Sequence, residues 1–546
     1  MTEDAAVTVN RSISGNVATL FAERAAAMAD HVAIVDRYHG RDRATTFGDL
    51  EAHGARIAGL LRRVGLGRGD IVLIGEPPGL DFYATILAIL RVGAVAMIVE
   101  PGAGRSGIAA ACDAARPRAV FAPARVLALA LRIPSVRAIP LRLTSSFWFP
   151  TATSVRSARR LLPDRQVACF AADAPAVLTF TSGSTGAPKG AIRTHALLEA
   201  QHGALRSVAA SAGDVDLVSL PVVVLANLAA GATSVLADVD GRSPGTANLD
   251  GMKGQLVRLA PTRLTVPPIL VERLAREGGV LALGRLRRIV TGGGPLFNDV
   301  MTLVRAVAPG VELVSVYGST EAEPIAHVSA ASVSDADSRK MLCGAGLLAG
   351  TPVPEVALRI VRLTAETLPA CLTQADLDSR TAAAGEPGEI IVSGGHVVAG
   401  YLHGRGDGET KLRVGDIVWH RTGDAGYLDP DGRVWLLGRV SAAICDERGA
   451  AHPFAVECAA RAAIGARRLA LTAIDGRRTL VVEGALTADE ERRLRDALAW
   501  ALLDDIVGVP RLPMDSRHGS KVDYPALAAL LSRHRLVRAG LATGSR

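Results

Sequence analysis

The sequence has 546 residues, of which 49% are hydrophobic and 4% aromatic, and its formal net charge is +7. Such a chain is too long for one ordinary domain, so we expect two to four domains with cores of Ala, Val and Leu. The arginines look scattered and form no basic tail or aromatic–basic stripe, which argues against a nucleic-acid partner.

Residues 46–99 alternate between helix and strand patterns. Helical spacing of apolar residues predicts helices over 46–65 and 80–93, the second capped by Asp81. The apolar runs "DIVLIG" at 70–75 and "AVAMIV" at 94–99 predict buried strands. Strands that alternate with helices indicate parallel sheets with helices on their faces.

A Gly/Ser-rich loop follows the next strand. "AVLTFT" at 176–181 predicts a buried strand that "SGSTG" at 182–186 cannot continue, and a helix is expected from Thr194 as its N-cap. Such a loop can wrap backbone N–H groups and hydroxyls around an anion, with Lys189 as a mobile charge at its rim. Pro188 before the lysine excludes a Walker A loop, and a plain flexible surface loop is the alternative.

Lysine is rare in this chain, which makes the lysine in the glycine loop notable. Of the 61 basic residues only five are lysines, so 56 are arginines; the lysines are Lys189, Lys253, Lys340, Lys411 and Lys521. A slim ammonium fits a single phosphate or carboxylate oxygen, where the broad fork of arginine does not.

Two later strands also end in polar turns. "LRRIVTGGGPL" at 286–296 predicts a strand and a glycine turn, and "VELVSVYGSTEAEP" at 311–324 predicts a strand and a polar turn. Ligands of parallel sheets bind at the carboxyl ends of the strands. The loops at 181–190, 292–295 and 317–321 are therefore expected to line one crevice.

The last third of the chain predicts two smaller units. After about residue 390, short alternating strands indicate a small antiparallel, barrel-like β unit, and from about 440 strands and a helix near 487–503 indicate an α+β domain. The expected fold is α/β, with a large N-terminal domain of parallel sheets over residues 1–438 and a small mobile domain over 439–546. The segments 329–342 and 364–386, rich in Ser, Ala and Asp, are expected to be the least regular.

Four motifs together resemble one family. "TFTSGSTGAPKGAIRTH", "VYGSTEAEP", "RTGDAGYLDPDGRVWLLGR" and a near-terminal lysine occur in the order typical of the adenylate-forming superfamily of acyl-CoA ligases, adenylation domains and luciferases. The resemblance spans nearly the whole chain. It implies an AMP-forming ligase that uses ATP and Mg²⁺, in which a carboxylate attacks the α-phosphate of ATP to give an acyl-adenylate and pyrophosphate.

The resemblance assigns phosphate and metal roles. Glu321 stands at the family's magnesium position, Lys189 faces the β- and γ-phosphates, and Lys521 bridges the carboxylate and the phosphate oxygens. The loop residues implied to bind nucleotide with Lys189 are Thr181, Ser182, Gly183, Ser184, Thr185 and Gly186.

It also assigns adenosine roles. Tyr317 is implied to stack on adenine, and Asp424 to accept hydrogen bonds from the ribose hydroxyls with Arg439 nearby. The other residues implied to line this pocket are Gly293, Gly294, Pro295, Gly318, Ser319 and Thr320. Taken singly, Glu321 and Asp424 fit ordinary solvated acids at turns and Tyr317 fits a core residue; the ordered set of motifs favours the site.

Three further stretches resemble one branch of the superfamily, the β-lactone synthetases of bacterial olefin biosynthesis. These are "VEPGAGRSGIAAACDAARPRAVFAP", "GRVSAAICDERGAAHPFAVECAA" and the ending "LPMDSRHGSKVDYPALAALL". That branch implies a 3-hydroxy acid whose own hydroxyl attacks the adenylate carbonyl, expelling AMP. Arg517 and His518 are then candidate catalytic residues, His518 as a base for the hydroxyl, or else they only shape the loop.

Residues 438–440 are expected to form the hinge between the two domains, and the segment that follows departs from ordinary ligases of the superfamily. Ser441 replaces the acid expected two residues after Arg439, and "SAAICDERG" lacks the lysine that serves thioester formation. Ala442 and Ala443 also depart from the basic segment expected in the olefin enzymes. A natural-product relative with another acyl chain therefore stays open.

Three functions compete at this point. The first is β-lactone formation, the second an acyl ligase that passes its adenylate to CoA or a carrier protein, and the third a non-catalytic nucleotide-binding relative, for which the presence of both motif lysines is unexpected. A partner enzyme of the same pathway is also open. The apolar segment "PVVVLANLAAG" at 221–231 is expected to wall the acyl pocket without setting a chain length.

The remaining features indicate a cytoplasmic protein. The six cysteines have no CxxC spacing, and the N-terminus "MTEDAAVTVN" lacks the apolar core of a signal peptide. The apolar stretches at 84–100 and 221–238 are interrupted by Arg91, Gly93 and Asn227, so no integral membrane segment is expected.

Overall fold

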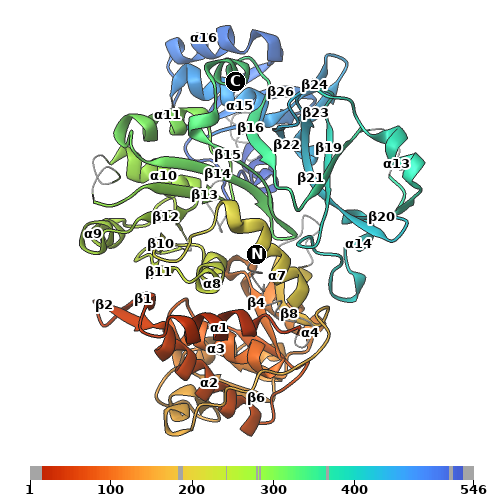
Figure 1. The fold of residues 1–546 in the computed structure, drawn as a ribbon. Helices are drawn as coiled ribbons and strands as arrows, with labels where there is room; N and C mark the ends of the chain where they lie inside the picture. The colour runs from red at the N-terminus through yellow and green to blue at the C-terminus, as the bar shows by residue number, and fades with distance from the viewer. Residues whose placement is uncertain are drawn as a thin grey trace, which may run out of the picture. The chain divides into compact units, whose positions relative to one another are not determined.

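The computed structural model describes residues 15–181, 188–241, 243–277, 281, 284–363, 368–465, 467–515 and 521–532. The chain divides into two compact units (Figure 1). The first holds residues up to Asp216, Pro221–Leu236 and Val398–Asp407; the second holds Leu217–Leu220, Ala237–Val397 and the chain from Gly408. Both sides of the expected boundary at 438/439 lie in the second unit, so that boundary stays a prediction.

A seven-stranded sheet forms the centre of the first unit. Its order is β7-β6-β5-β3-β4-β8-β9, and all neighbours are parallel except β8 and β9. The strands of this unit are β1 (Val32–Tyr38), β2 (Arg41–Thr46), β3 (Ile71–Ile74), β4 (Val95–Val99), β5 (Ala119–Phe121), β6 (Leu141–Thr144), β7 (Thr153–Ser154), β8 (Pro175–Thr181), β9 (Lys189–Thr194) and β11 (Thr233–Leu236), with β10 (Val215–Val218) at the division.

Helices on this sheet follow from amphipathic sequence. α2 begins after Thr46, whose side chain accepts a hydrogen bond from the Asp49 N–H, and it buries one apolar face that includes Leu50 and Ile57. The helices of the unit are α1 (Ala18–Ala27), α2 (Phe47–Arg63), α3 (Leu80–Val92), α4 (Gly104–Ala115), α5 (Ala124–Ala130), α6 (Pro134–Arg137), α7 (His195–Ala204) and α8 (Pro221–Ala230).

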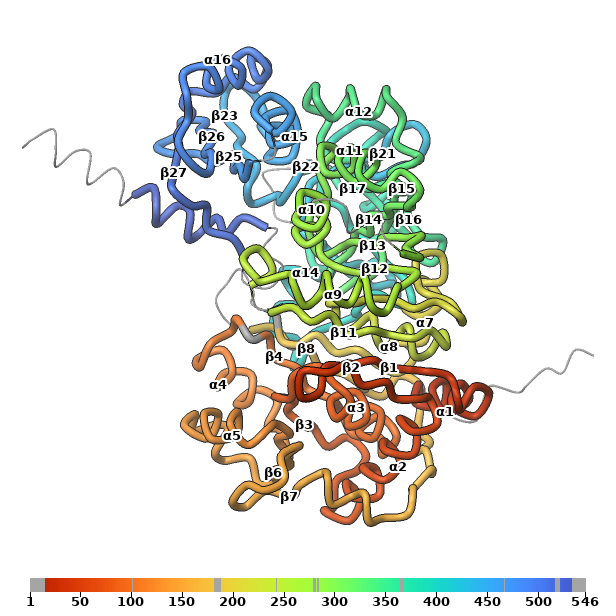
Figure 2. The backbone as a smooth tube through the Cα atoms, turned by 90° about the vertical axis from the view of Figure 1, so that its left-hand side faces the viewer, coloured from red at the N-terminus to blue at the C-terminus, as the bar shows by residue number. Residues whose placement is uncertain are grey.

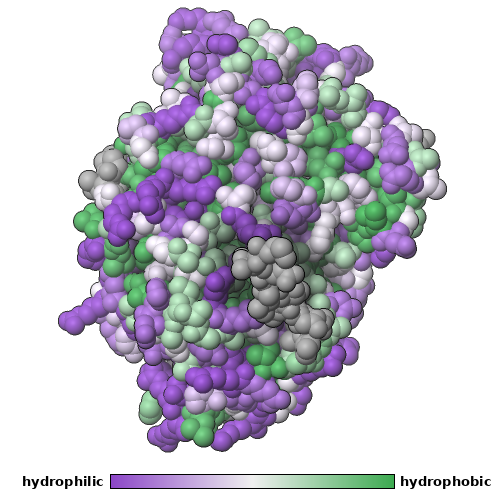
Figure 3. Space-filling view, viewed as in Figure 1, coloured by the Kyte–Doolittle hydropathy of each residue, from purple (hydrophilic) through white to green (hydrophobic). Residues whose placement is uncertain are grey.

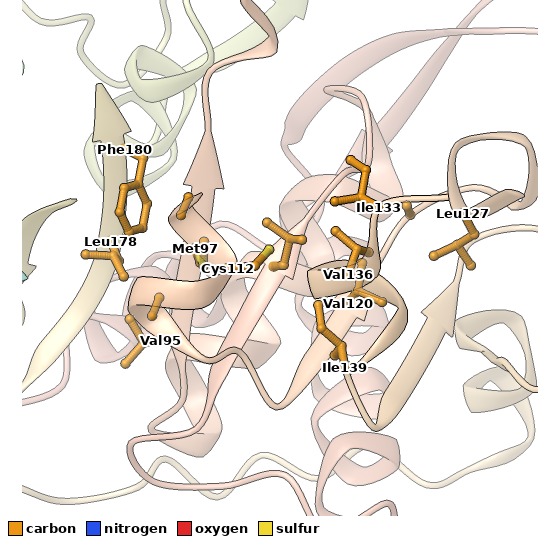
Figure 4. Packing of buried hydrophobic residues seen from close by; sticks show 14 residues of the cluster. Val95, Met97, Cys112, Val120, Leu127, Ile133, Val136, Ile139, Leu178 and Phe180 are labelled. Atoms are coloured by element: carbon orange, nitrogen blue, oxygen red, sulfur yellow. The ribbon is translucent and has the colours of Figure 1, made fainter. Parts of the chain in front are cut away.

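A core of aliphatic side chains fills the space between this sheet and its helices. Met97 of β4, Cys112 of α4, Leu127 of α5 and Phe180 of β8 are all buried in it (Figure 4). With so few aromatic residues in the chain, the predicted reliance on small aliphatic side chains is confirmed for this core.

Two details of the first unit differ from the sequence expectation. α3 begins after Gly79, and Asp81 lies in its first turn, where its carboxylate bonds His53 Nε2 at 3.0 Å. Residues 189–194, expected to be loop, form β9. The side chains of Ala191 and Arg193, two residues apart, are both buried, as expected for a strand that pairs with β8.

The second unit holds a mixed sheet in the order β17-β19-β21-β22-β16-β15-β14-β13-β12. β12, β13 and β14 are parallel, and the rest of this path is antiparallel, which confirms the expected antiparallel β unit. The strands are β12 (Arg263–Val266), β13 (Arg288–Gly292), β14 (Glu312–Ser319), β15 (Ala322–Ser329), β16 (Leu347–Pro352), β17 (Ala357–Val361), β18 (Cys371–Leu372), β19 (Gly388–Ser393), β20 (Lys411–Val414), β21 (Ile417–Leu428) and β22 (Val434–Arg439).

Helices α10 and α11 pack on each other beside β13 (Figure 1). The helices here are α9 (Asp250–Leu259), α10 (Pro268–Arg276), α11 (Asn298–Val307), α12 (Asp335–Leu342), α13 (Gln374–Arg380) and α14 (Asp407–Thr410). Helices α12 and α13 form within 329–342 and within the described part of 364–386, the segments expected to be the least regular, and capping boxes at Ser334 and Thr373 start them.

The C-terminal part of this unit forms its own α+β lobe, as predicted (Figure 2). A sheet in the order β25-β26-β27 packs with α15 and α16 around buried residues such as Leu480 and Leu494. Its elements are β23 (Ile444–Asp446), β24 (Gly449–Ala451), α15 (Pro453–Ile464), β25 (Leu469–Ile474), β26 (Arg477–Glu483), α16 (Ala488–Ala497) and β27 (Asp505–Val509), so α16 ends earlier than expected. Most side chains of α16 are charged, and the surface is mainly hydrophilic in the region where Figure 1 draws this helix (Figure 3).

Candidate active site

The β8–β9 hairpin carries the Gly/Ser loop. Thr181 pairs with Lys189 across the hairpin, so this lysine stands at the foot of the loop. The implied nucleotide-binding residues Ser182, Gly183, Ser184, Thr185 and Gly186 lie outside the described residues. Lys189 is the first residue of β9 and lies opposite the carboxyl end of β8, and its role in nucleotide binding stays a prediction.

The side chain of Lys189 lies beside residues 401–406 of the first unit. Its Nζ is 6.0 Å from the ring centroid of Tyr401, whose backbone bridges Ala191 of β9. Gly406 has φ +97°, and a Cβ there would lie 2.6 Å from Lys189 Cδ. The backbone conformation favours glycine at 406, and a Cβ there would force the flexible Lys189 side chain to move.

In the second unit, the glycine turn and the polar turn leave neighbouring parallel strands. Gly292 at the end of β13 pairs with Val316 of β14, and a Cβ on Gly292 would lie 3.0 Å from the Val316 carbonyl oxygen. The implied pocket residues Gly293, Gly294 and Pro295 after β13 and Gly318, Ser319 and Thr320 beside Tyr317 are all partly exposed. Two of the predicted loops therefore lie side by side.

Tyr317, Asp424 and Arg439 form one polar cluster. The Tyr317 hydroxyl donates to Asp424 Oδ2 at 2.8 Å, and Arg439 Nη1 lies 3.3 Å from Asp424 Oδ1. Asp424 and Arg439 are register partners on β21 and β22. Burial and then the Asp424 charge raise the pKa of Tyr317 well above its ordinary value, and Asp424 raises the pKa of Arg439. The hydroxyl is therefore a neutral donor and the guanidinium a fixed cation at neutral pH.

A backbone network holds the carboxylate in place. Thr422 Oγ1 donates to the Ile390 carbonyl and accepts from the Asp424 N–H at 3.0 Å. Arg439 Nη1 donates to the Thr422 carbonyl at 2.8 Å. Asp424 is thus presented from a fixed strand and is not a solvated acid at a free turn.

Glu321 follows the polar turn, and its N–H donates to Ser319 Oγ at 3.3 Å. Across the described residues, no group of three or more His, Cys, Asp or Glu could hold a metal ion. A single carboxylate fits Mg²⁺ that arrives with a nucleotide, because Mg²⁺ is usually held by one or two carboxylates, substrate phosphates and waters.

Lys411 and His420 form a buried pair that the sequence reasoning did not assign. They are register partners on β20 and β21, and Lys411 Nζ lies 3.2 Å from His420 Nδ1. Burial and then Lys411 lower the pKa of His420 to about 3, while the Glu321 charge acts in the opposite sense. His420 is therefore neutral at neutral pH, and its Nδ1 also lies 3.2 Å from the Thr410 carbonyl oxygen. The sequence signal that could have drawn attention to Lys411 is the rarity of lysine, because Lys411 is one of only five lysines in the chain.

Lys521 is exposed and belongs to the C-terminal part of the second unit. Its N–H donates to Asp515 Oδ1 and its carbonyl accepts from the Asp515 N–H, both at 2.8 Å. It makes no hydrogen bond or ion pair with Tyr317 or Asp424, all three being among the described residues. Arg517 and His518 lie outside the described residues, so their roles stay predictions.

Comparison with known proteins identifies the family. The family model of the AMP-binding enzymes matches residues 21–402. The chain belongs to this family. It is an adenylate-forming ligase, as the four motifs predicted, and its α/β fold with a smaller C-terminal lobe is that of the family.

Relatives of known activity differ in their final product. The chain is 29% identical to an olefin β-lactone synthetase of Stenotrophomonas maltophilia, over 95% of this chain and 98% of that protein. It is 28% identical to the 4-coumarate–CoA ligase 3 of Oryza sativa subsp. japonica, over 72% of this chain and 69% of that protein.

Solved structures share the fold across the same length. The amide bond synthetase McbA of Marinactinospora thermotolerans matches with a TM-score of 0.76 and 21% identity, covering 94% of this chain and 99% of that one. ATP-bound MatB of Rhodopseudomonas palustris matches with a TM-score of 0.75 and 21% identity, covering 94% and 98%. None of the helices in the described ranges has the length and apolar character to cross a bilayer.

Proposed function

We propose that the protein uses ATP to activate a 3-hydroxy acid as its adenylate and then closes the adenylate to a β-lactone. The observation that carries the proposal is the near full-length similarity to an olefin β-lactone synthetase. The lysine-free hinge segment after Arg439 adds support, because a CoA ligase would be expected to hold a lysine there.

In the first step a carboxylate oxygen attacks the α-phosphorus of ATP and pyrophosphate leaves. Asp424, fixed by Thr422 and Arg439, accepts from the ribose hydroxyls, and the ring of Tyr317 stacks on the base. Lys189 and Lys521 neutralise charge on the phosphates and on the approaching carboxylate. Glu321 would hold Mg²⁺, which supplies further charge neutralisation when it is bound.

In the second step the 3-hydroxyl oxygen of the substrate attacks the acyl carbon. The bond from that carbon to the AMP oxygen breaks, AMP leaves, and the hydroxyl proton passes to a base, for which we propose His518. The intramolecular nucleophile needs no second substrate.

The competing function transfers the adenylate to CoA or to a carrier-protein thiol, and the similarity to a 4-coumarate–CoA ligase favours keeping it. The protein should be incubated with ATP, Mg²⁺ and a series of 3-hydroxy acids, with and without CoA or a carrier protein. The products should be identified by mass spectrometry. Lactone without any thiol supports the proposal. A thioester formed only with the thiol would replace lactone closure but keep adenylate formation.

Lys521→Ala should lower adenylate formation by at least about a hundredfold, because a charge-stabilising group in the transition state is lost. ATP binding should change by less than about threefold, since the ground-state contacts remain. Lys253→Ala is the matched control, because Lys253 pairs with Glu277 on the second unit and has no assigned role. Equal loss of binding and chemistry in Lys521→Ala would contradict the role given to this lysine.

A further inference from the structure

The net charge of the chain is concentrated in one segment of 50 residues. Between residues 121 and 170 there is one acid, Asp164, and there are no lysines, so this segment carries the whole formal charge of +7. The interpretation that the arginines are scattered along the chain is therefore wrong for this segment. The arginines of this segment are Arg125, Arg132, Arg137, Arg142, Arg156, Arg159, Arg160 and Arg165.

The same segment exposes aromatic side chains at a loop tip. The loop of residues 145–152, between β6 and β7, carries Phe147 and Trp148, which are 85% and 70% exposed. The next residue, Phe149, packs against the buried core of the first unit. Phe149 thus holds the loop to the core, while the rings of Phe147 and Trp148 are exposed to solvent. Exposed apolar groups of this size often mark an interaction site.

Two arginine side chains, Arg142 and Arg156, donate hydrogen bonds to this loop. Arg142 donates to Thr151 Oγ1 at 2.8 Å and to the Arg137 carbonyl at 3.0 Å. Arg156 Nε donates to the carbonyl of Ser145, the first loop residue, at 2.8 Å.

The loop is also tied to the start of α5. The Ala124 N–H donates to Ser146 Oγ at 2.9 Å, so Arg125 and, one turn later, the 58%-exposed Leu129 lie on the helix beside the loop. The elements α5, β6 and β7 occupy the same region of the trace in Figure 2. We call Phe147, Trp148, Leu129 and the four arginines 125, 137, 142 and 156 the basic–aromatic surface.

Two acids, Glu76 and Asp81, interact electrostatically with arginines of this surface without forming ion pairs with them. None of its four arginines forms an ion pair with a carboxylate in the described part of the chain. Glu76 accepts from Ser145 Oγ at 2.7 Å, and burial raises the pKa of its carboxyl to about 7 despite Arg125 and Arg156. The carboxylate of Asp81, which is paired with His53 at 3.0 Å, also interacts electrostatically with Arg156. Glu76 is therefore only partly charged at neutral pH.

We propose that the basic–aromatic surface docks the protein on an anionic phospholipid bilayer. Arginines pair with lipid phosphates, and exposed Trp and Phe rings insert at the boundary between headgroups and acyl chains. Leu129 favours a bilayer over a single-stranded nucleic acid, because an aliphatic side chain buries in hydrocarbon but does not stack on bases. The inference is independent of the proposed reaction, since binding requires no turnover.

The test is sedimentation of the full-length protein with vesicles of phosphatidylcholine, with or without phosphatidylglycerol. The protein should bind the anionic vesicles, and added salt should weaken the binding. The double variant Phe147→Ser, Trp148→Ser should bind at least about tenfold more weakly, and Arg125→Gln and Arg137→Gln about fivefold each. Trp148 fluorescence should shift to the blue on binding, and Trp148→Phe should lose that shift.

Matched controls are Val257→Ser and Arg305→Gln, exposed residues of the second unit that should change binding by less than about twofold. ATP–pyrophosphate exchange by every variant reports that the fold is intact, because none of these residues belongs to the candidate active site. Absence of binding to anionic vesicles, or equal binding by the double variant, would overturn the proposal. Binding to a single-stranded oligonucleotide or polyglutamate that depends on Phe147 and Trp148, without vesicle binding, would also overturn it.

Discussion

Tyr317 contributes both a ring and a hydroxyl to the candidate site, and the two can be tested separately. The hydroxyl donates to Asp424 at 2.8 Å, and the ring is proposed to stack on the base. Tyr317→Phe keeps the ring and should lower the free energy of unfolding by about 1 kcal/mol, measured by urea denaturation. Its KM for ATP should stay within about threefold, whereas Tyr317→Ala should raise that KM at least about tenfold. Equal KM values for the two variants would show that the ring does not contact the base.

Gly406 offers a test of Lys189 that leaves the lysine itself in place. Gly406→Ala puts a Cβ 2.6 Å from Lys189 Cδ, so the flexible lysine chain must move. We expect the KM for ATP to rise about tenfold through loss of one charge-assisted contact, measured by pyrophosphate exchange.

The control for this change is Gly385→Ala, because Gly385 also has a positive φ, of +81°, but meets nothing within 4 Å. Both variants should lose about 1 kcal/mol of stability from the left-handed backbone, measured by urea denaturation. If Gly385→Ala raised the KM for ATP as much as Gly406→Ala, the effect would be one of stability and the placement of Lys189 would be irrelevant.

At the residue scale, sequence could predict the identity of site residues but not their mutual contacts. Motif order pointed to Tyr317, Asp424 and Arg439, and the structure brings these three together. The Lys411–His420 pair could not be foreseen, because it depends on the β20–β21 register. Such pairing places two residues with no shared motif on one face of a sheet.

At the element scale, an ion pair joins α12 to the turn before β22. Arg433 donates to both oxygens of Asp337, at 2.9 and 3.0 Å, and also to Asp429. Arg433 lowers the pKa of Asp337 from its ordinary 3.8 to about 2. The pair therefore stabilises the fold above pH ~4, and that stability is lost as the pH falls toward 2, by on the order of 2 kcal/mol.

Asp337→Asn should accordingly lower the free energy of unfolding at pH 7 by about 2 kcal/mol and flatten its decline between pH ~4 and ~2. Urea denaturation at a series of pH values measures both effects. Asp335→Asn, at an exposed position in the first turn of the same helix, should have a small effect. A wild-type-like slope in Asp337→Asn would contradict the assignment of this pair.

Local sequence signals explain which elements were predicted well. Long apolar periodic segments such as 46–65 gave correct helices, because burial of one face dominates their energy. Helices α12 and α13 were missed because their signal is short, a capping box of Ser334 with Asp337 and of Thr373 with Asp376. β9 was missed because a strand after a Gly/Ser loop is specified by pairing with β8 and not by its own composition.

At the scale of the whole molecule, the order of motifs carries more information than any one element. The family model matches residues 21–402 and so includes the motifs at 178–195 and 316–324, whose loops leave different strands, while the motif at 421–439 follows the matched residues. The sequence shows that the positive charge is concentrated in residues 121–170, but the structure is needed to show that Phe147 and Trp148 of this segment are exposed beside its arginines.

The central claim is that the acid is activated as an adenylate before ring closure. A 3-hydroxy acid with isotopically heavy carboxylate oxygens tests it most directly, with ATP and Mg²⁺ and mass analysis of the products. One heavy oxygen should appear in AMP, and one should remain as the lactone carbonyl, because the attacking carboxylate oxygen leaves with the phosphate. AMP without heavy oxygen, or lactone that keeps both heavy oxygens, would contradict the account.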